Sequence, residues 1–208
     1  MESYRQALER ARQNGACAEA LEELEHLRSW DEFFSHACAP EWAYWYAHRV
    51  LRERWSEAEP TIATDPKWAC RYANEIIRGR FPEGEPAIAK DSCWAYWYAH
   101  NIIRGRFPEA EPALSKDPCM AYHYAAYVLC DRFPEAEPVI ALNPYLAYWY
   151  ARDVIRDRFP EGEPAIAKNP HLSYQYALTI IKDRFPEAEP VIRKSSLCRA
   201  YVLNFGML

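Results

Sequence analysis

The chain has no long apolar run, few glycines and no paired cysteine motif. Its 208 residues include Gly 6 and Cys 7, with no CxxC pair. No apolar stretch approaches the ~18–20 residues that a membrane-spanning helix needs. The N-terminal stretch MESYRQALERARQNG is charged and helical in pattern, so we expect no signal peptide. These absences predict a soluble cytoplasmic protein with reduced thiols.

Sequence motifs that carry chemistry are also missing. Gly79 and Gly105 lie within Arg-Gly-Arg near expected helix ends, and not in a phosphate-binding loop between a strand and a helix. No Ser/His/Asp or Cys/His arrangement stands out, and His48 and His100 lie two repeats apart, too far to share a metal ion. We therefore predict that the protein is not an enzyme and has no catalytic residue, cofactor or metal. The net charge of −5 argues against a simple basic nucleic-acid binder.

The chain has instead a 26-residue repeat. Residues 95–120 read AYWYAHNIIRGRFPEAEPALSKDPCM, and residues 121–146 read AYHYAAYVLCDRFPEAEPVIALNPYL. A fixed period of roughly 20–50 residues indicates a solenoid or array. Six clear copies start at Ala43, Ala69, Ala95, Ala121, Ala147 and Ser173, and places within a copy are counted from these residues.

Local rules predict a helical hairpin in each copy. Asp or Asn followed by Pro, as in Asp117-Pro118, caps a first helix of about fifteen residues that runs to a recurrent Arg. Phe-Pro then breaks this helix, and Glu-x-Glu-Pro-x-Ile forms a second, short one. We predict an all-α fold, an α-solenoid of about six 26-residue helical hairpins in a single domain. Residues 1–40 form a helical cap with a degenerate repeat, 41–194 the tandem repeats, and 195–208 a C-terminal cap.

The segment RFPEAEP recurs unchanged at 106–112, 132–138 and 184–190. Over residues 41–194 the block resembles short tandem α-helical repeats with an RFPEAEP-type core, found in phage and other viral or microbial proteins of unassigned function. The resemblance implies a helical repeat fold and a viral origin, and it brings no activity with it. Trp55-Ser56 in the first copy departs from the Phe-Pro of the pattern.

Some places do not change between copies. They are Tyr at the fourth place, Ala at the fifth, Arg at the twelfth and the Glu-x-Glu-Pro that follows. The Arg and both Glu can form a ladder of ion pairs, whereas paired carboxylates alone would also suit acid–base catalysis or a metal. Six identical sets favour the ladder. Cys93 and Cys119 share one place in successive copies, which predicts small packing residues.

Other places vary between copies. At 100° per residue, the third, sixth, seventh and tenth places share one outer face of the first helix. Trp alternates there with Arg71, His123 and Gln175 at the third place, and the tenth place is mostly basic. The residues predicted to bind a partner are Trp45, His48, Arg52, Arg71, Arg78, Trp97, His100, Asn101, Arg104, His123, Trp149, Arg152 and Arg156.

Two interpretations of this outer face stay open. In one, the cations are solvated and the Trp rings lie on neighbouring side chains. In the other, Trp and Arg form a surface that binds a protein partner with an acidic surface, because these residue types dominate interface hot spots. The viral resemblance then suggests a host factor that the protein blocks. The alternative function is binding of RNA or single-stranded nucleic acid, with bases on Trp and phosphates on the Arg row. No membrane partner is expected.

Overall fold

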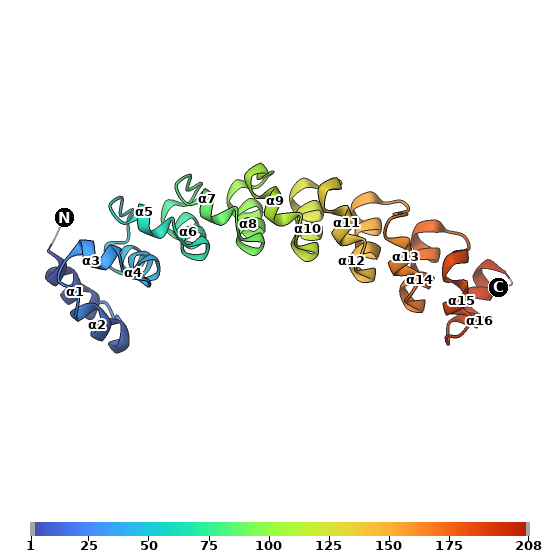
Figure 1. The fold of residues 1–208 in the computed structure, drawn as a ribbon, viewed down its shortest axis with the longest axis horizontal. Coiled ribbons are helices and arrows are strands. Elements are labelled where there is room, and N and C mark those ends of the chain that lie inside the picture. Colours follow the sequence, from blue (N-terminus) through green and yellow to red (C-terminus); the bar gives the residue numbers. More distant parts are fainter. Residues whose placement is uncertain (1–2, 207–208) are drawn as a thin grey trace. The chain divides into compact units, whose positions relative to one another are not determined.

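The computed structural model describes residues 3–206, and over that range the chain is all-helical and built from regularly repeating helix pairs (Figure 1). The predicted all-α, solenoid-like repeat is therefore confirmed. The chain divides into two compact units, unit 1 (Met1–Ile103) and unit 2 (Arg104–Leu208). No helix within residues 3–206 is long and apolar enough to cross a membrane. The first two residues of the predicted N-terminal segment and the last two of the predicted C-terminal cap lie outside the described range.

Unit 1 contains the N-terminal cap and the first copies of the repeat. The cap consists of α1 (Tyr4–Gln13), α2 (Ala18–Glu25) and α3 (Trp30–Phe34). Because the next helix begins at Ala39, the predicted boundary at residue 40 falls within its first turn. The copies contribute α4 (Ala39–Tyr46), η1 (Ala47–Leu51), α5 (Glu59–Ile62), α6 (Pro66–Tyr72), η2 (Ala73–Ile77), α7 (Glu85–Ile88), α8 (Ser92–Tyr98) and η3 (Ala99–Ile103).

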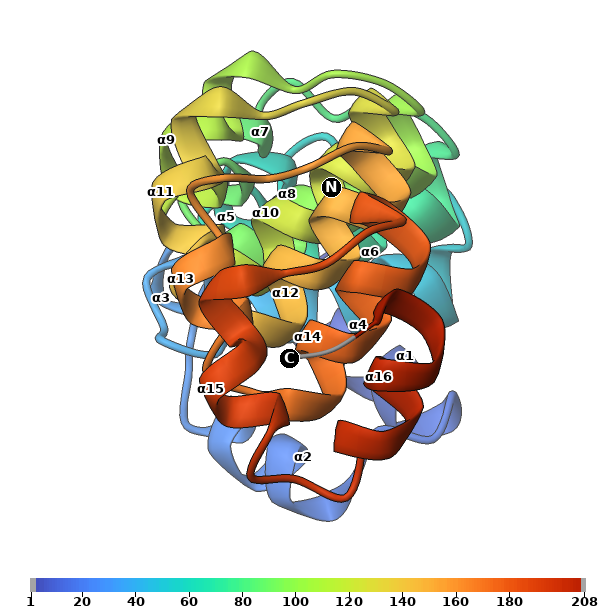
Figure 2. The same ribbon diagram turned by 90° about the vertical axis from the view of Figure 1, so that its right-hand side faces the viewer.

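Unit 2 continues the same pattern. Its elements are η4 (Pro108–Ala110), α9 (Glu111–Leu114), α10 (Pro118–Tyr124), η5 (Ala125–Leu129), η6 (Pro134–Ala136), α11 (Glu137–Ile140), α12 (Pro144–Trp149), η7 (Tyr150–Ile155), α13 (Glu163–Ile166), α14 (Pro170–Tyr176), η8 (Ala177–Ile181), η9 (Pro186–Ala188), α15 (Glu189–Ile192) and α16 (Cys198–Phe205). Helix α16 lies at the C-terminal end of the unit (Figure 2). There Asn204 donates a hydrogen bond to the Tyr174 hydroxyl at 2.9 Å, and this bond links α16 to α14.

The predicted helix starts are confirmed. Asn143, which Pro144 follows, accepts hydrogen bonds from the backbone N–H groups of Tyr145 and Leu146. Asp91, which no proline follows, is not among the predicted caps, yet it accepts from the backbone N–H of Trp94. Such caps satisfy backbone donors that have no partner inside the helix. Asp65, Asp117 and Asn169 cap their helices in the same way.

The predicted helix ends are wrong. The first helix does not run to the twelfth-place Arg, because each copy changes from α-helix to π-helix at the fifth or fourth place. The π-helix then ends at a tenth-place residue in the left-handed conformation, at φ 58 for Arg78 and φ 52 for Cys130. All six tenth-place residues share this conformation, which non-glycine residues rarely adopt. The neighbouring Gly79 and Gly105 do not adopt it.

Each copy places two kinds of aromatic ring in the core, the fourth-place Tyr and the ring at the turn between its helices. The fourth-place Tyr98 and Tyr150 are completely buried, as are Phe81 and Phe159 of the Phe-Pro turns. The second helix adds Ile140 and its counterparts, and the fifth-place Ala is fully buried in every copy, as predicted. The expectation that Cys93 and Cys119 are packing residues is wrong, since both lie exposed near the N-terminus of their helices. None of the seven cysteines, all of which lie within the described residues, forms a disulfide, and Cys70 is buried.

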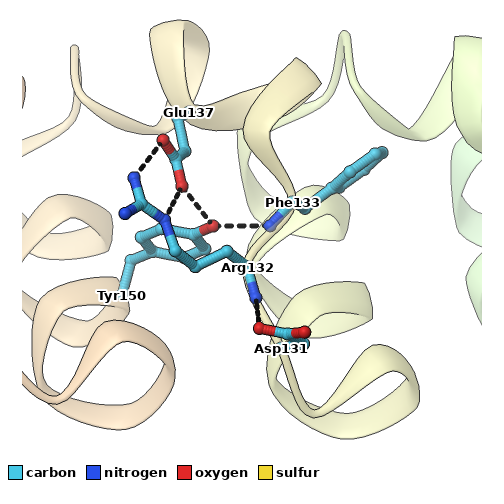
Figure 3. Close-up of polar contacts among 5 residues, drawn as sticks. All are labelled: Asp131, Arg132, Phe133, Glu137 and Tyr150. Atoms are coloured by element: carbon cyan, nitrogen blue, oxygen red, sulfur yellow. Dashed lines mark hydrogen bonds and ion pairs between the residues drawn. The ribbon is translucent and has the colours of Figure 1, made fainter.

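A polar cluster joins each copy to the next (Figure 3). Arg132 donates to both carboxylate oxygens of Glu137, from Nε and from Nη2, each at 2.7 Å. The hydroxyl of Tyr150, from the following copy, donates to Glu137 Oε1 at 3.0 Å and accepts from the backbone N–H of Phe133 at 2.7 Å. The cluster therefore ties together the end of one first helix, its turn, its second helix and the next first helix. We call this set of four groups the seam.

The seam recurs in every copy, so the predicted ladder of ion pairs is confirmed for the second Glu of each Glu-x-Glu. The first Glu, such as Glu135, is exposed and does not form the bidentate pair, so that part of the prediction is wrong. The arginine's hydrogen bonds hold the pKa of Glu137 below its ordinary value, although burial acts in the opposite direction. The pairs are Arg54–Glu59, Arg80–Glu85, Arg106–Glu111, Arg132–Glu137, Arg158–Glu163 and Arg184–Glu189.

The hydrogen bond from the turn to the tyrosine is retained where the repeat is irregular, at the first copy and at the C-terminal cap. Trp55 replaces Phe in the first copy, yet its N–H still donates to the Tyr72 hydroxyl at 2.7 Å. In the C-terminal cap, Tyr201 stands 16 residues after Phe185, where other copies have a spacing of 17, and it still accepts from the Phe185 N–H at 2.6 Å. Tyr201 of the C-terminal cap therefore supplies the hydroxyl group of the sixth copy's seam.

We predict that Tyr150→Phe lowers the free energy of unfolding by about 1–3 kcal/mol, because it leaves the buried N–H of Phe133 without its acceptor. The measurement is urea unfolding followed by circular dichroism. Tyr145→Phe is the matched control, because its hydroxyl is exposed and makes only a 3.5 Å contact with Asn169; we expect a change below about 0.5 kcal/mol. Equal effects of the two substitutions would contradict the seam.

We predict that Cys130→Gly raises the free energy of unfolding by about 0.5–1 kcal/mol. Glycine adopts φ 52 without the clash that a Cβ meets, and this gain exceeds the extra freedom that glycine gives the unfolded chain. Thermal unfolding checks the effect. Cys130→Ala retains a Cβ and is the control, for which we expect almost no change; identical melting temperatures for the two variants would refute the explanation.

Candidate functional site

Exposed large hydrophobic side chains are confined to one unit. Within the described residues they are Tyr127, Leu142, Tyr145, Trp149 and Leu203, all in unit 2. The first four lie on η5, on α12 and on the turn before α12. Tyr145 and Trp149 are spaced i, i+4 within α12 and so share one face of that helix, whereas Leu142 lies in the turn before its N-cap. Four of the five exposed large hydrophobic side chains among the described residues lie in this region.

The rings of this region touch one another. Tyr145 and Trp149 have ring centroids 6.3 Å apart, and Trp149 lies 6.0 Å from Tyr122 of α10. Tyr122 lies 6.5 Å from Tyr127, whose ring stacks on His123 at 5.8 Å. We call Tyr122, His123, Tyr127, Tyr145 and Trp149 the aromatic patch. Tyr122 is buried and supports the other rings from below, so the patch is held in place before any partner arrives.

A charged group anchors the base of the patch. The Tyr122 hydroxyl donates to Asp153 Oδ2 at 2.8 Å. Arg152 donates to both carboxylate oxygens of Asp153, and its guanidinium lies 5.5 Å from the Tyr148 ring. The hydrogen bonds from Arg152 hold the pKa of Asp153 below its ordinary value, more than burial raises it. Arg152, predicted to meet a partner, therefore has a structural partner already.

Five of the six seventh-place residues are exposed, in agreement with the helical projection, but some seventh-place residues also bond to the preceding copy. Asp153 accepts a hydrogen bond from Tyr122, and in unit 1 Glu75 accepts one from Tyr44 of the preceding copy at 2.6 Å. The seventh place lies within the π-helix, whose i→i+5 bonds place more than 3.6 residues in each turn. Several seventh-place side chains therefore bond across to the preceding copy. Asn101 is exposed, but its amide donates to the Trp97 carbonyl at 2.8 Å.

The three Trp at the third place differ in exposure, so the structure agrees with each of the two interpretations in part. Trp149 alone among them is exposed, at 37 %. Trp97 is half-buried and meets Trp94 edge-on at 6.4 Å. Trp45 is half-buried and lines a cavity against the N-terminal cap.

Four further predicted residues have local partners. The Arg71 guanidinium lies 5.3 Å from the ring of Trp68 in its own helix. His48 lies 3.3 Å from Glu75 and stacks on Tyr44. His100 is exposed and lies near the ring of Tyr96. His123 belongs to the aromatic patch. Within residues 3–206, no three His, Cys, Asp or Glu side chains are grouped closely enough to hold a metal ion.

The basic tenth-place row lies at the ends of helices. Its members are Arg52, Arg78, Arg104, Arg156 and Lys182, and all are exposed in the left-handed conformation. A cation at this position interacts favourably with the negative end of the helix dipole. The row thus has a structural explanation, and exposure leaves these side chains accessible as well.

The sequence interpretation missed Tyr127, Leu142 and Tyr145. Tyr127 occupies the seventh place, which the helical projection assigned to the outer face, but it was not included among the residues predicted to bind a partner. Tyr145 stands directly after an N-cap and Pro, at a place that reads Lys67, Cys93 and Cys119 in earlier copies. Variation at that place was the available signal for Tyr145.

No family model, no curated protein and no solved structure matches this chain. The fold and the aromatic patch are therefore the basis on which a function is inferred.

Proposed function

We propose that this chain is a non-catalytic repeat scaffold that binds a protein partner through the aromatic patch of unit 2. The observation that carries the proposal is the exposure of Tyr127 (55 %), Tyr145 (50 %) and Trp149 (37 %) around a buried Tyr122. Large contiguous apolar surfaces commonly mark interaction sites, and Tyr and Trp are enriched among interface hot spots. The proposed binding site is therefore one aromatic cluster of unit 2, and not the whole outer face of the first helices.

The patch suits an interface because its rings are already ordered. Ring contacts between neighbours limit the side-chain freedom that binding would otherwise remove. Asn169 also donates to the Tyr145 hydroxyl, at 3.5 Å. A partner would bury an apolar side chain against Tyr145 and Trp149.

Protein binding is favoured over nucleic-acid binding by the charges near the patch. Phosphate contacts need several available cations, because counterion release provides most of the affinity. Arg152 is engaged by Asp153, and exposed Asp131 and Asp157 add negative charge next to tenth-place residues. Stacking of bases on Trp149 and Tyr145 would therefore lack a strong row of cations beside it.

The proposal extends to the kind of partner. The RFPEAEP-type repeat resembles those of phage and other viral or microbial proteins, and a scaffold of viral origin without catalytic groups would act by occupying a host protein. In this proposal, the chain blocks a host factor by covering its interaction surface. The first step is to capture that factor from the native host, identify it by mass spectrometry and produce it in pure form.

We predict that Tyr127→Ala/Tyr145→Ala/Trp149→Ala weakens binding of the purified partner by about 100-fold or more, because hot-spot truncations cost ~2 kcal/mol or more each. Isothermal titration calorimetry measures this effect. Leu203→Ala removes another exposed hydrophobic side chain of unit 2 outside the patch and should leave the affinity within about twofold. Circular dichroism checks that both variants fold.

Two outcomes would contradict the proposal. One is wild-type affinity in the triple variant. The other is tight, steeply salt-dependent binding of a mixed-sequence single-stranded RNA that the triple variant loses, which would assign the patch to nucleic acid.

A further inference from the structure

A cavity of ≈ 140 Å³ lies within unit 1, between the N-terminal cap and the first copy. Helices α1 and α2 form one wall, and α3, α4 and the turn at Trp55 form the other. It is separate from the aromatic patch, which belongs to unit 2. Trp45, predicted from the sequence to face a partner on the outside, lines this cavity.

The cavity lies where the cap departs from the repeat. Phe33 stands 26 residues before Glu59, at the sequence position where later copies carry the seam glutamate. Phe33 is buried and packs against Trp30 and Trp55, with ring centroids 5.5 and 6.3 Å away. The facing wall presents Ala7, Ala11, Ala16 and Ala20. Small side chains opposite large rings leave a space that none of residues 3–206 fills.

Aromatic rings dominate the lining. Trp30, Trp42, Trp45 and Trp55 all contribute, together with Phe33 and Tyr46. The hydroxyl of Tyr4, which also lines the cavity, donates to the Leu24 carbonyl at 2.9 Å. The faces of aromatic rings carry partial negative charge, and Trp attracts cations most strongly.

Glu41 is the only charged side chain among the described residues that line the cavity. It lies in the first turn of α4 and is exposed, so its carboxylate stands at the edge of the space and not within it. No Lys, Arg or His of the described chain lines the cavity. The site therefore combines apolar surface, electron-rich rings and a negative charge at the rim, which together favour a weakly hydrated cation over a neutral or anionic ligand.

The volume limits the ligand. A cavity of about 150 Å³ in another protein holds benzene, and a trimethylammonium group is of similar size. Recognition of quaternary ammonium groups by cages of aromatic side chains is a recurring use of cation–π attraction. We propose that this cavity binds the trimethylammonium group of a small organic cation, with the Trp rings around its methyl groups and Glu41 near its charge.

The test is titration of the full chain with choline and with its neutral isostere 3,3-dimethylbutan-1-ol, followed by calorimetry and tryptophan fluorescence. We expect choline to bind about tenfold more tightly, since the two ligands differ in charge and not in shape. Glu41→Gln should remove most of that preference, whereas Glu109→Gln, an exposed glutamate of unit 2, should not. Ala20→Leu, which fills the cavity from α2, should abolish binding without loss of helicity.

Three results would overturn the proposal. They are absence of choline binding, equal affinity for choline and the isostere, and wild-type binding by Ala20→Leu. N-acetyl-trimethyllysine amide supplies the same group from a protein side chain; tighter binding of choline than of this amide supports a small cation, and the reverse order refutes that assignment.

Discussion

The fold depends on one hydrogen-bonded group, in which a tyrosine hydroxyl donates to a glutamate and accepts from a phenylalanine amide. The Phe-Pro turn places that amide outside any helix, where a buried N–H without a partner would cost about 1–3 kcal/mol. The tyrosine satisfies it from the next copy, as Tyr124 does for Phe107 at 2.7 Å. The arginine then neutralises the glutamate, whose side chain is only 14 % exposed in the case of Glu111. Each copy therefore supplies the tyrosine hydroxyl that satisfies the buried N–H and the glutamate of the preceding copy.

The residues that hold the fold together therefore differ from those that are proposed to bind a partner or a ligand. The fourth-place Tyr, the fifth-place Ala and the Arg–Glu pair are all used in the interior or along the seam, and they cannot change without loss of stability. Side chains outside the seam are free of that constraint. They accumulate as exposed rings around Trp149 in unit 2, and as a ring-lined cavity beside Trp45 in unit 1. Both proposed sites consist of residues at positions that vary between copies or that lie in or beside the N-terminal cap.

Much of this architecture follows from the sequence. The period, the N-caps at residues such as Asp117 and the Arg–Glu pairs rest on local rules, and the structure contains each of them. The first helix ends at the tenth-place residue, before the Phe-Pro that was predicted to break it. The π-helix could not be predicted, because residues such as Ala125 and Leu129 suit an α-helix equally well. A helical projection at 100° per residue is therefore inexact after the fifth place, although the seventh- and tenth-place residues that it assigned to the outer face are mostly exposed.

The site was harder to predict for a different reason. Exposure of a ring depends on its neighbours in the adjacent copies, which no single-helix projection includes. Trp97 and Trp149 occupy the same place in the repeat, yet Trp97 is half-buried and Trp149 is exposed. The cavity of unit 1 depends on three cap helices whose sequence departs from the repeat, so no comparison between copies could reveal it.

Amide hydrogen exchange tests the central role of the seam most directly. The backbone N–H groups of Phe81, Phe107, Phe133, Phe159 and Phe185 lie in turns outside the helices, where exchange is ordinarily fast, yet each donates to a buried tyrosine hydroxyl. The seam predicts that these amides exchange as slowly as the slowest helical amides of the same unit. Exchange as fast as that of exposed turn residues such as Glu135 would contradict it.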